Sequence, residues 1–125
     1  MSKYMLLLHD REELSELSPD EIQGIIEKHQ AWMDGLREQG RFHGGDKLAA
    51  GGRTLVPSGA GVAVKDGPYS EGKEILGGYY LIEAASDDDA EAAARDLHAG
   101  GAHRTTIEVR QIEREPGAGG RSHSE

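Results

Sequence analysis

The 125-residue sequence contains no cysteine. This absence excludes disulfides, thiolate metal ligands and thiol nucleophiles, and it predicts a reducing environment. Long apolar runs are absent too, since no stretch reaches the roughly 18 residues that span a membrane, and the first residues show no secretion-signal pattern. We therefore expect a cytoplasmic protein that does not insert into a membrane.

Basic and aromatic residues are also scarce. The chain has 23 acidic residues against 14 Lys and Arg, which gives a formal charge of −9 at pH 7. Nucleic acids and anionic membranes bind basic surfaces, so this charge argues against both as direct partners. With one Trp, one Phe and four Tyr, the core must rely mainly on aliphatic side chains. The length predicts one domain, residues 1–115, followed by a flexible Gly- and Ser-rich tail, residues 116–125.

The clearest element is a helix from Pro19 to about Gln39. Ser18 is a suitable N-cap, and Glu21 completes the S-x-x-E capping box. Gly40 fits the left-handed position that follows a helix end.

The apolar side of this helix includes a histidine. At about 100° per residue, the apolar stripe is formed by a set of regularly spaced residues, with His29 near its middle. The other members are Ile22, Ile25, Ile26, Trp32, Met33 and Leu36. We expect His29 to face the sheet, either as a general acid or base, because imidazole titrates near neutrality, or as an inert hydrogen-bonded core residue.

The remaining pattern predicts strands at residues 3–9, 41–50, 75–85 and 105–113, a loop at residues 10–16, and a hairpin at residues 54–65. A second helix follows Ser86 and ends near His98. The order is β-α-β-β-β-α-β, an α+β fold in which a hairpin is inserted into a ferredoxin-like plan with a mainly antiparallel sheet. The helices leave one sheet face uncovered, so Tyr79 or Tyr80 needs a cover, and we expect a homodimer packed sheet to sheet.

A tight corner lies between the hairpin and the strand at residues 75–85. Asp-Gly favours positive φ, and a proline cannot donate to a strand ladder, so the chain turns here. The corner presents Asp66, Pro68, Tyr69, Glu71 and Lys73 around one loop. We expect the last four to bind substrate. Asp66 either orients His29, holds a substrate hydroxyl, or only stabilises the turn.

These motifs carry a resemblance to a known family. The residues in question are Lys3-Tyr4-Met5-Leu6-Leu7, His29, Asp66-Gly67-Pro68-Tyr69 with Glu71, Lys73 and Glu74, and Gly77-Gly78-Tyr79-Tyr80. The sequence resembles the YCII-related family, in particular its DGPF-domain branch. The resemblance implies a dimeric α+β barrel of ferredoxin-like protomers. It also implies a small-molecule enzyme with a histidine–aspartate site and lyase-type chemistry.

Two functions follow as alternatives. The first is an enzyme in which His29 transfers a proton, or promotes an elimination, with Asp66 as its carboxylate. The second is a non-catalytic dimer that binds a ligand or a protein partner, and the resemblance links this role to sigma factors and transcription. The six histidines lack H-x-x-x-H and H-x-H spacing, so we expect no metal site. No phosphate-binding loop or dinucleotide fingerprint occurs, so we expect no cofactor.

Overall fold

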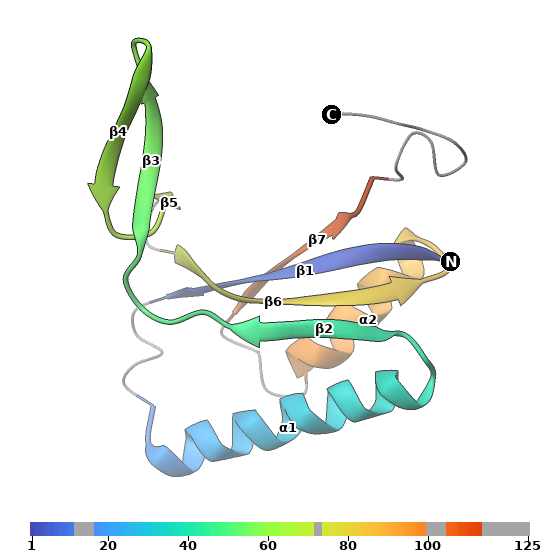
Figure 1. Ribbon diagram of the computed structural model, residues 1–125. Coiled ribbons are helices and arrows are strands. Elements are labelled where there is room, and N and C mark those ends of the chain that lie inside the picture. Colours follow the sequence, from blue (N-terminus) through green and yellow to red (C-terminus); the bar gives the residue numbers. More distant parts are fainter. Residues whose placement is uncertain (12–16, 72–73, 100–104, 114–125) are drawn as a thin grey trace.

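The computed structural model describes residues 1–11, 17–71, 74–99 and 105–113. The predicted tail, residues 116–125, lies outside the described residues. Two helices cover one face of a sheet, while a hairpin rises from one end of that sheet (Figure 1). The elements are β1 (Ser2–Arg11), α1 (Pro19–Glu38), β2 (Phe42–Lys47), β3 (Arg53–Ser58), β4 (Gly61–Asp66), β5 (Ser70–Glu71), β6 (Glu74–Ala84), α2 (Asp87–Ala99) and β7 (Thr106–Gln111).

The main sheet has the strand order β2-β6-β1-β7, and the short β5 pairs with the start of β6. All of its pairings are antiparallel. Each helix connects two strands that have a third strand between them, which is the split β-α-β arrangement of ferredoxin-like folds. The predicted fold class, α+β with a mainly antiparallel sheet, is confirmed.

Both helix starts follow from local hydrogen bonds. The Ser18 hydroxyl accepts a 3.1 Å bond from the Glu21 backbone N–H, and the Glu21 carboxylate accepts a 3.0 Å bond from the Ser18 N–H. This capping box satisfies two backbone donors that would otherwise lack partners. The chain leaves α1 through Gly40 at φ +71°, where a side chain would be strained. At α2, the Ser86 hydroxyl accepts a 3.1 Å bond from the Asp89 N–H.

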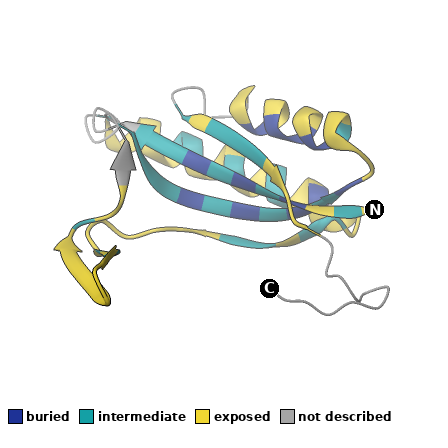
Figure 2. Cartoon of the chain, turned by 90° about the horizontal axis from the view of Figure 1, so that it is seen from above, coloured by how far each residue is buried: buried dark blue, intermediate teal, exposed yellow. Residues whose placement is uncertain are grey.

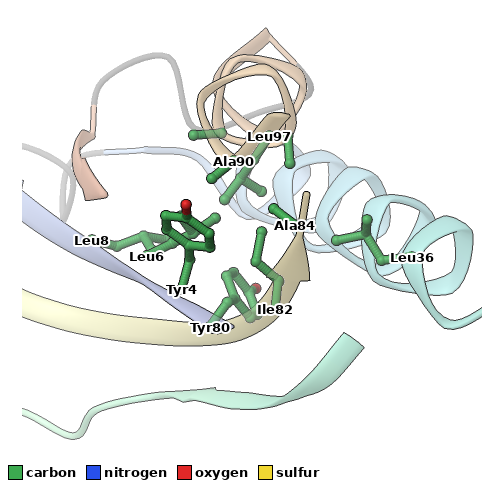
Figure 3. Close-up of a cluster of buried hydrophobic side chains, with 11 residues drawn as sticks. Tyr4, Leu6, Leu8, Leu36, Tyr80, Ile82, Ala84, Ala90 and Leu97 are labelled. Atoms are coloured by element: carbon green, nitrogen blue, oxygen red, sulfur yellow. The ribbon is translucent and has the colours of Figure 1, made fainter. Parts of the chain in front are cut away.

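The core lies between the sheet and the two helices (Figure 3). Leu6 and Ile82 from the sheet and Leu97 from α2 are fully buried. Burying an aliphatic side chain of this size stabilises a fold by about 1.5–3 kcal/mol. The other buried members are Tyr4, Leu8, Leu36, Tyr80, Ala84, Ala90, Ala93 and Ala94.

Three local predictions were wrong. Ile22 and Ile26 were placed on the inner side of α1, yet they are 42% and 53% exposed, because the core contacts of this helix come from its second half. Asp10 was placed in a loop, yet β1 continues through Arg11 by pairing with β6. Residues 12–16 of that predicted loop lie outside the described residues.

The two tyrosines of β6 point to opposite faces of the sheet. Tyr80 pairs across from Leu6 and is 9% exposed beneath the helices. Tyr79 pairs across from Leu7 on the face that neither of the two described helices covers, here called the open face. The open face carries Met5, Leu7, Tyr79 and Leu81, all half-buried.

Strands β3 and β4 form a separate two-stranded sheet, here called the arm, residues 53–66. Most of the arm is exposed, whereas buried residues recur along the strands of the main sheet (Figure 2). The arm rises on the side of the sheet opposite α1 (Figure 1). At its base, the Gly67 N–H donates a 2.8 Å bond to the Gly52 carbonyl. In the described part of the chain, no helix is long and apolar enough to cross a membrane.

Candidate functional site

His29 lies in the middle of α1 and meets the main sheet. Its Nδ1 is 3.1 Å from the Tyr80 hydroxyl, a contact between the helix and β6. Its other ring nitrogen, Nε2, is buried and has no hydrogen-bond partner within the described residues. An unpaired buried polar atom costs about 1–3 kcal/mol, so this atom is a candidate position for a bound water or ligand group.

Aromatic rings fix the position of Tyr80. The ring of Trp32 lies 4.9 Å from that of Tyr80, and the ring of Phe42 lies 6.0 Å away. Trp32 is itself held by a 3.0 Å bond from its indole N–H to the Ala93 carbonyl. Gly45 faces Tyr80 across the strand pair, and a Cβ at Gly45 would collide with the Tyr79 carbonyl and the Tyr80 ring. The hydroxyl that meets His29 therefore depends on a glycine in β2.

The carboxylate that influences His29 comes from Asp10 on β1. Asp10 follows Leu8 with the alternation of a strand, so both point to the helix side of the sheet. The Thr105 hydroxyl donates a 2.9 Å bond to Asp10 Oδ1. On β6, a Cβ at Gly77 would collide with the Asp10 carboxylate. This glycine is the extra residue at the register shift beyond the Leu8–Gly78 pair, and it leaves room for that carboxylate.

Burial favours the neutral forms of His29 and Tyr80. Burial lowers the pKa of His29, and the charge of Asp10 raises it by a smaller amount. The imidazole is therefore neutral at pH 7, with a lone pair available on one nitrogen. Burial also raises the pKa of Tyr80, with a smaller contribution from Asp46, so the phenol keeps its proton. A neutral histidine beside a neutral tyrosine can accept a proton, and the charge of Asp10 favours the imidazolium that results.

The predicted corner lies at the base of the arm. Asp66 is exposed and pairs with Arg53 in the arm ladder. Gly67 has φ +96°, as predicted, and its carbonyl accepts a 2.9 Å bond from the Thr54 hydroxyl. Pro68 is exposed, and Tyr69 is 69% exposed. Of the other two predicted substrate contacts, Glu71 lies in β5 without a described side chain, and Lys73 lies outside the described residues.

The corner lies close to Asp10 because strand pairing in the main sheet connects them. Ile75 pairs with Ser70 of β5 on one side and with Asp10 of β1 on the other. Two strand spacings amount to about 10 Å, so the corner ends one strand away from the carboxylate that acts on His29. The structure thus brings His29 and Tyr80 into contact, the charge of Asp10 acts on His29, and Asp66 lies in the neighbouring arm.

Sequence reasoning missed Asp10 and Tyr80 as partners of His29. A signal for Asp10 was present, because Tyr4, Leu6, Leu8 and Asp10 follow one another with strand period. A charged residue that continues a buried strand face is a candidate for a site. Among the residues that the structure describes, no group of three or more His, Asp or Glu side chains could hold a metal ion.

The fold and this site define an α+β protein of ferredoxin-like plan with a half-buried histidine between helix and sheet. The model of the YCII-related domain matches residues 2–115, so the chain belongs to the YCII-related family. A relative from Rhizobium meliloti (strain 1021), described as an uncharacterized protein, is 44% identical over 59 residues. That match covers 47% of this chain and 48% of the relative, so it spans about half the length of each.

Proposed function

We propose that this chain is a small-molecule enzyme that transfers a proton, with His29 as its acid–base residue and no resident cofactor. The observation that carries the proposal is the buried Nε2 of His29, which has no hydrogen-bond partner among the described residues. A substrate C–H or O–H group placed at this atom would supply the missing partner. The motif at Asp66–Tyr69 supports the finer assignment to the DGPF-domain branch of the family.

The contacts of His29 suggest how the proton moves. With its proton on Nδ1 donated to the Tyr80 oxygen, the lone pair on Nε2 is free to accept a proton. The substrate C–H bond breaks, and its electron pair stays on the substrate as an enolate or expels a leaving group from the adjacent carbon. The charge of Asp10 favours the imidazolium that forms, since it raises the pKa of His29. The same proton can return to the substrate in an isomerisation.

The surroundings of His29 favour a substrate with an apolar or cyclic body. Ile26 and Ile22 lie on the same stripe of α1, one and two turns before His29 respectively, and both are exposed. Exposed aliphatic side chains beside a polar reactive atom are typical of ligand sites. In this proposal Asp66, Pro68, Tyr69, Glu71 and Lys73 contact the polar end of the substrate, and Asp10 takes the role of the carboxylate paired with His29.

We further propose a homodimer through the open face, in a reducing cytoplasm. The half-buried Met5, Leu7, Tyr79 and Leu81 supply an apolar centre. Polar contacts between histidine and glutamate flank them, His9–Glu108 at 3.0 Å and His43–Glu83 at 3.3 Å. An apolar centre within a polar rim is the usual anatomy of a protein interface.

Proton abstraction can be measured before the natural substrate is known. The full chain is incubated in D2O with a panel of small cyclic and aromatic keto acids, and ¹H NMR follows the loss of each α-proton signal. We expect exchange of at least one compound to fall about 100-fold or more in His29→Gln, since general acid–base groups contribute 10²–10⁴-fold. His98→Gln is the matched control, because His98 is exposed at the end of α2.

The competing function gives the opposite result. If His29→Gln and the unmodified chain exchange every compound at the same rate, the proton-transfer mechanism is wrong. The non-catalytic binding module, with a ligand or a transcription-linked protein as its partner, would then take its place.

A further inference from the structure

The arm exposes an apolar row that belongs to no core. Leu55, Val62 and Val64 are 60%, 60% and 58% exposed. Leu55 pairs with Val64 and Pro57 pairs with Val62, so these side chains lie on one face of the two-stranded sheet. We call Leu55, Pro57, Val62 and Val64 the apolar row.

Such a surface needs a cover. A two-stranded hairpin alone in water is marginally stable, and contiguous exposed apolar side chains usually mark a contact surface. The arm belongs to a sheet separate from the main one, and all residues of β4 are exposed. Among the described residues, none buries the β4 side chains, so we look for their cover outside this part of the chain.

The position of the arm indicates a second copy of this chain. It rises on the side of the main sheet opposite α1, beside the uncovered face (Figures 1 and 2). Its six residue pairs give a length of about 20 Å, whereas stacked sheets lie only about 10 Å apart. When two open faces meet, each arm reaches past the sheet of the other copy. One two-fold axis relates both contacts, as in an isologous dimer.

The charges of the arm and of the rest of the chain also favour a second copy of this chain as the partner. The arm contains Arg53, Lys65 and Asp66, so its net charge is +1. Because the whole chain has a net charge of −9, the residues outside the arm together carry −10. Two acidic bodies repel each other, but each attracts the weakly basic arm of the other.

We propose that the arm is a dimerisation clasp, whose apolar row packs on the second copy of this chain when the two open faces meet. The clasp goes beyond the proposed catalysis, because it makes no use of His29. It does build on the proposed dimer. Proton exchange and oligomeric state are separate measurements, so either proposal can fail alone.

Sedimentation equilibrium of the full chain over nanomolar to micromolar concentrations tests the clasp. We expect the unmodified chain to be a dimer and Leu55→Ser/Val64→Ser to raise its dissociation constant about ten-fold or more, since both substitutions remove apolar contact area. Ala63→Ser is the matched control, because Ala63 pairs with Val56 on the opposite face of the arm, and we expect a change below about two-fold. A monomer at all concentrations, or equal constants for the double variant and the unmodified chain, would overturn the proposal.

Hydrogen exchange of the unmodified chain gives a second test, which does not depend on how the variants fold. We expect the backbone amides of residues 53–66 to exchange more slowly above the dissociation constant than below it, because the second copy shields the arm. If hydrogen exchange of the arm amides does not depend on protein concentration, the clasp is contradicted even if the open faces form a dimer. That result would mean that the arm is free or covered by something other than this chain.

Discussion

The two faces of the main sheet are built from alternating residues of the same strands, yet they differ in what meets them. Leu6 on the helix face is fully buried, whereas its neighbour Leu7 on the open face is half-buried. The histidines differ in the same way. His29 packs against the helix face with one nitrogen unpaired among the described residues, while His9 on the open face forms a 3.0 Å hydrogen bond with Glu108.

The two faces therefore differ in their contribution to stability and in the environment of their polar groups. On the helix face, burial lowers the pKa of His29, and one nitrogen of its ring has no hydrogen-bond partner among the described residues. The open face pairs its charged groups with each other, so they are satisfied without a ligand. The following predictions test this comparison, from the largest expected effect to the smallest.

The largest effect is expected from a truncation of the core. Leu6→Ala should lower the free energy of unfolding by about 2–5 kcal/mol, because it leaves a cavity beneath both helices. Leu7→Ala should lower the free energy of unfolding of the monomer by clearly less, because Leu7 is only half-buried. Urea denaturation at low protein concentration measures both values. Equal losses for the two variants would show that the two faces are packed alike.

The second prediction concerns the glycine beside Asp10. Gly77→Ala should destabilise the fold by about 1–3 kcal/mol, because its Cβ would collide with the Asp10 carboxylate. Gly24→Ala is the control, since no atom lies within 4 Å of a Cβ at this position of α1 and alanine favours helices by about 1 kcal/mol. Thermal unfolding should therefore move in opposite directions for the two variants. A shared direction would contradict the close approach of Asp10 to β6.

The third prediction concerns the titration of His29. Its pKa should lie below 6.5, and Asp10→Asn should lower it further, because the variant removes the charge that opposes the effect of burial. Two-dimensional NMR of the imidazole over pH 4–8 measures both values. The unfolded state binds more protons between the folded pKa and 6.5, so the contribution of His29 to stability falls as the pH drops through that range. Asp66→Asn is the comparison variant, and a larger shift in it than in Asp10→Asn would identify Asp66 as the carboxylate beside His29.

The smallest effect is expected on the open face. Hydrogen bonds from His9 and then from Arg110 hold the pKa of Glu108 below its usual 4.5. The stabilisation from this carboxylate is therefore present above pH 4.5 and lost as the pH falls through its folded pKa. The difference in melting temperature between pH 6 and pH 3.5 should shrink in Glu108→Gln. High salt should reduce the effect as well, because the pair is exposed.

Much of the fold could be predicted because its signals are local. The capping box at Ser18 and the Gly40 exit define α1, and the second helix follows Ser86 as predicted. The period of α1 also indicated that His29 faces the sheet, which agrees with its contact to Tyr80. Helix period and caps need no knowledge of distant residues.

The partners of His29 could not be predicted, because they depend on strand register. The choice between Tyr79 and Tyr80 reverses if the pairing of β6 shifts by one residue, and the register of β6 does shift near Gly77. Asp10 has the polarity of a loop residue and belongs to a strand only because β6 continues beside it. Its hydrogen-bond partner Thr105 comes from the far end of the chain.

The closed base of the arm has a consequence for sequence change in this protein. Because the Gly67 N–H bonds the Gly52 carbonyl, the chain enters and leaves the arm at nearly the same point. Strand pairs added or removed beyond that bond would change the reach of the arm without altering the path of the chain through the main sheet. Insertions or deletions of paired residues in the arm would therefore leave the main sheet intact and act on the contact that the arm makes with a second copy.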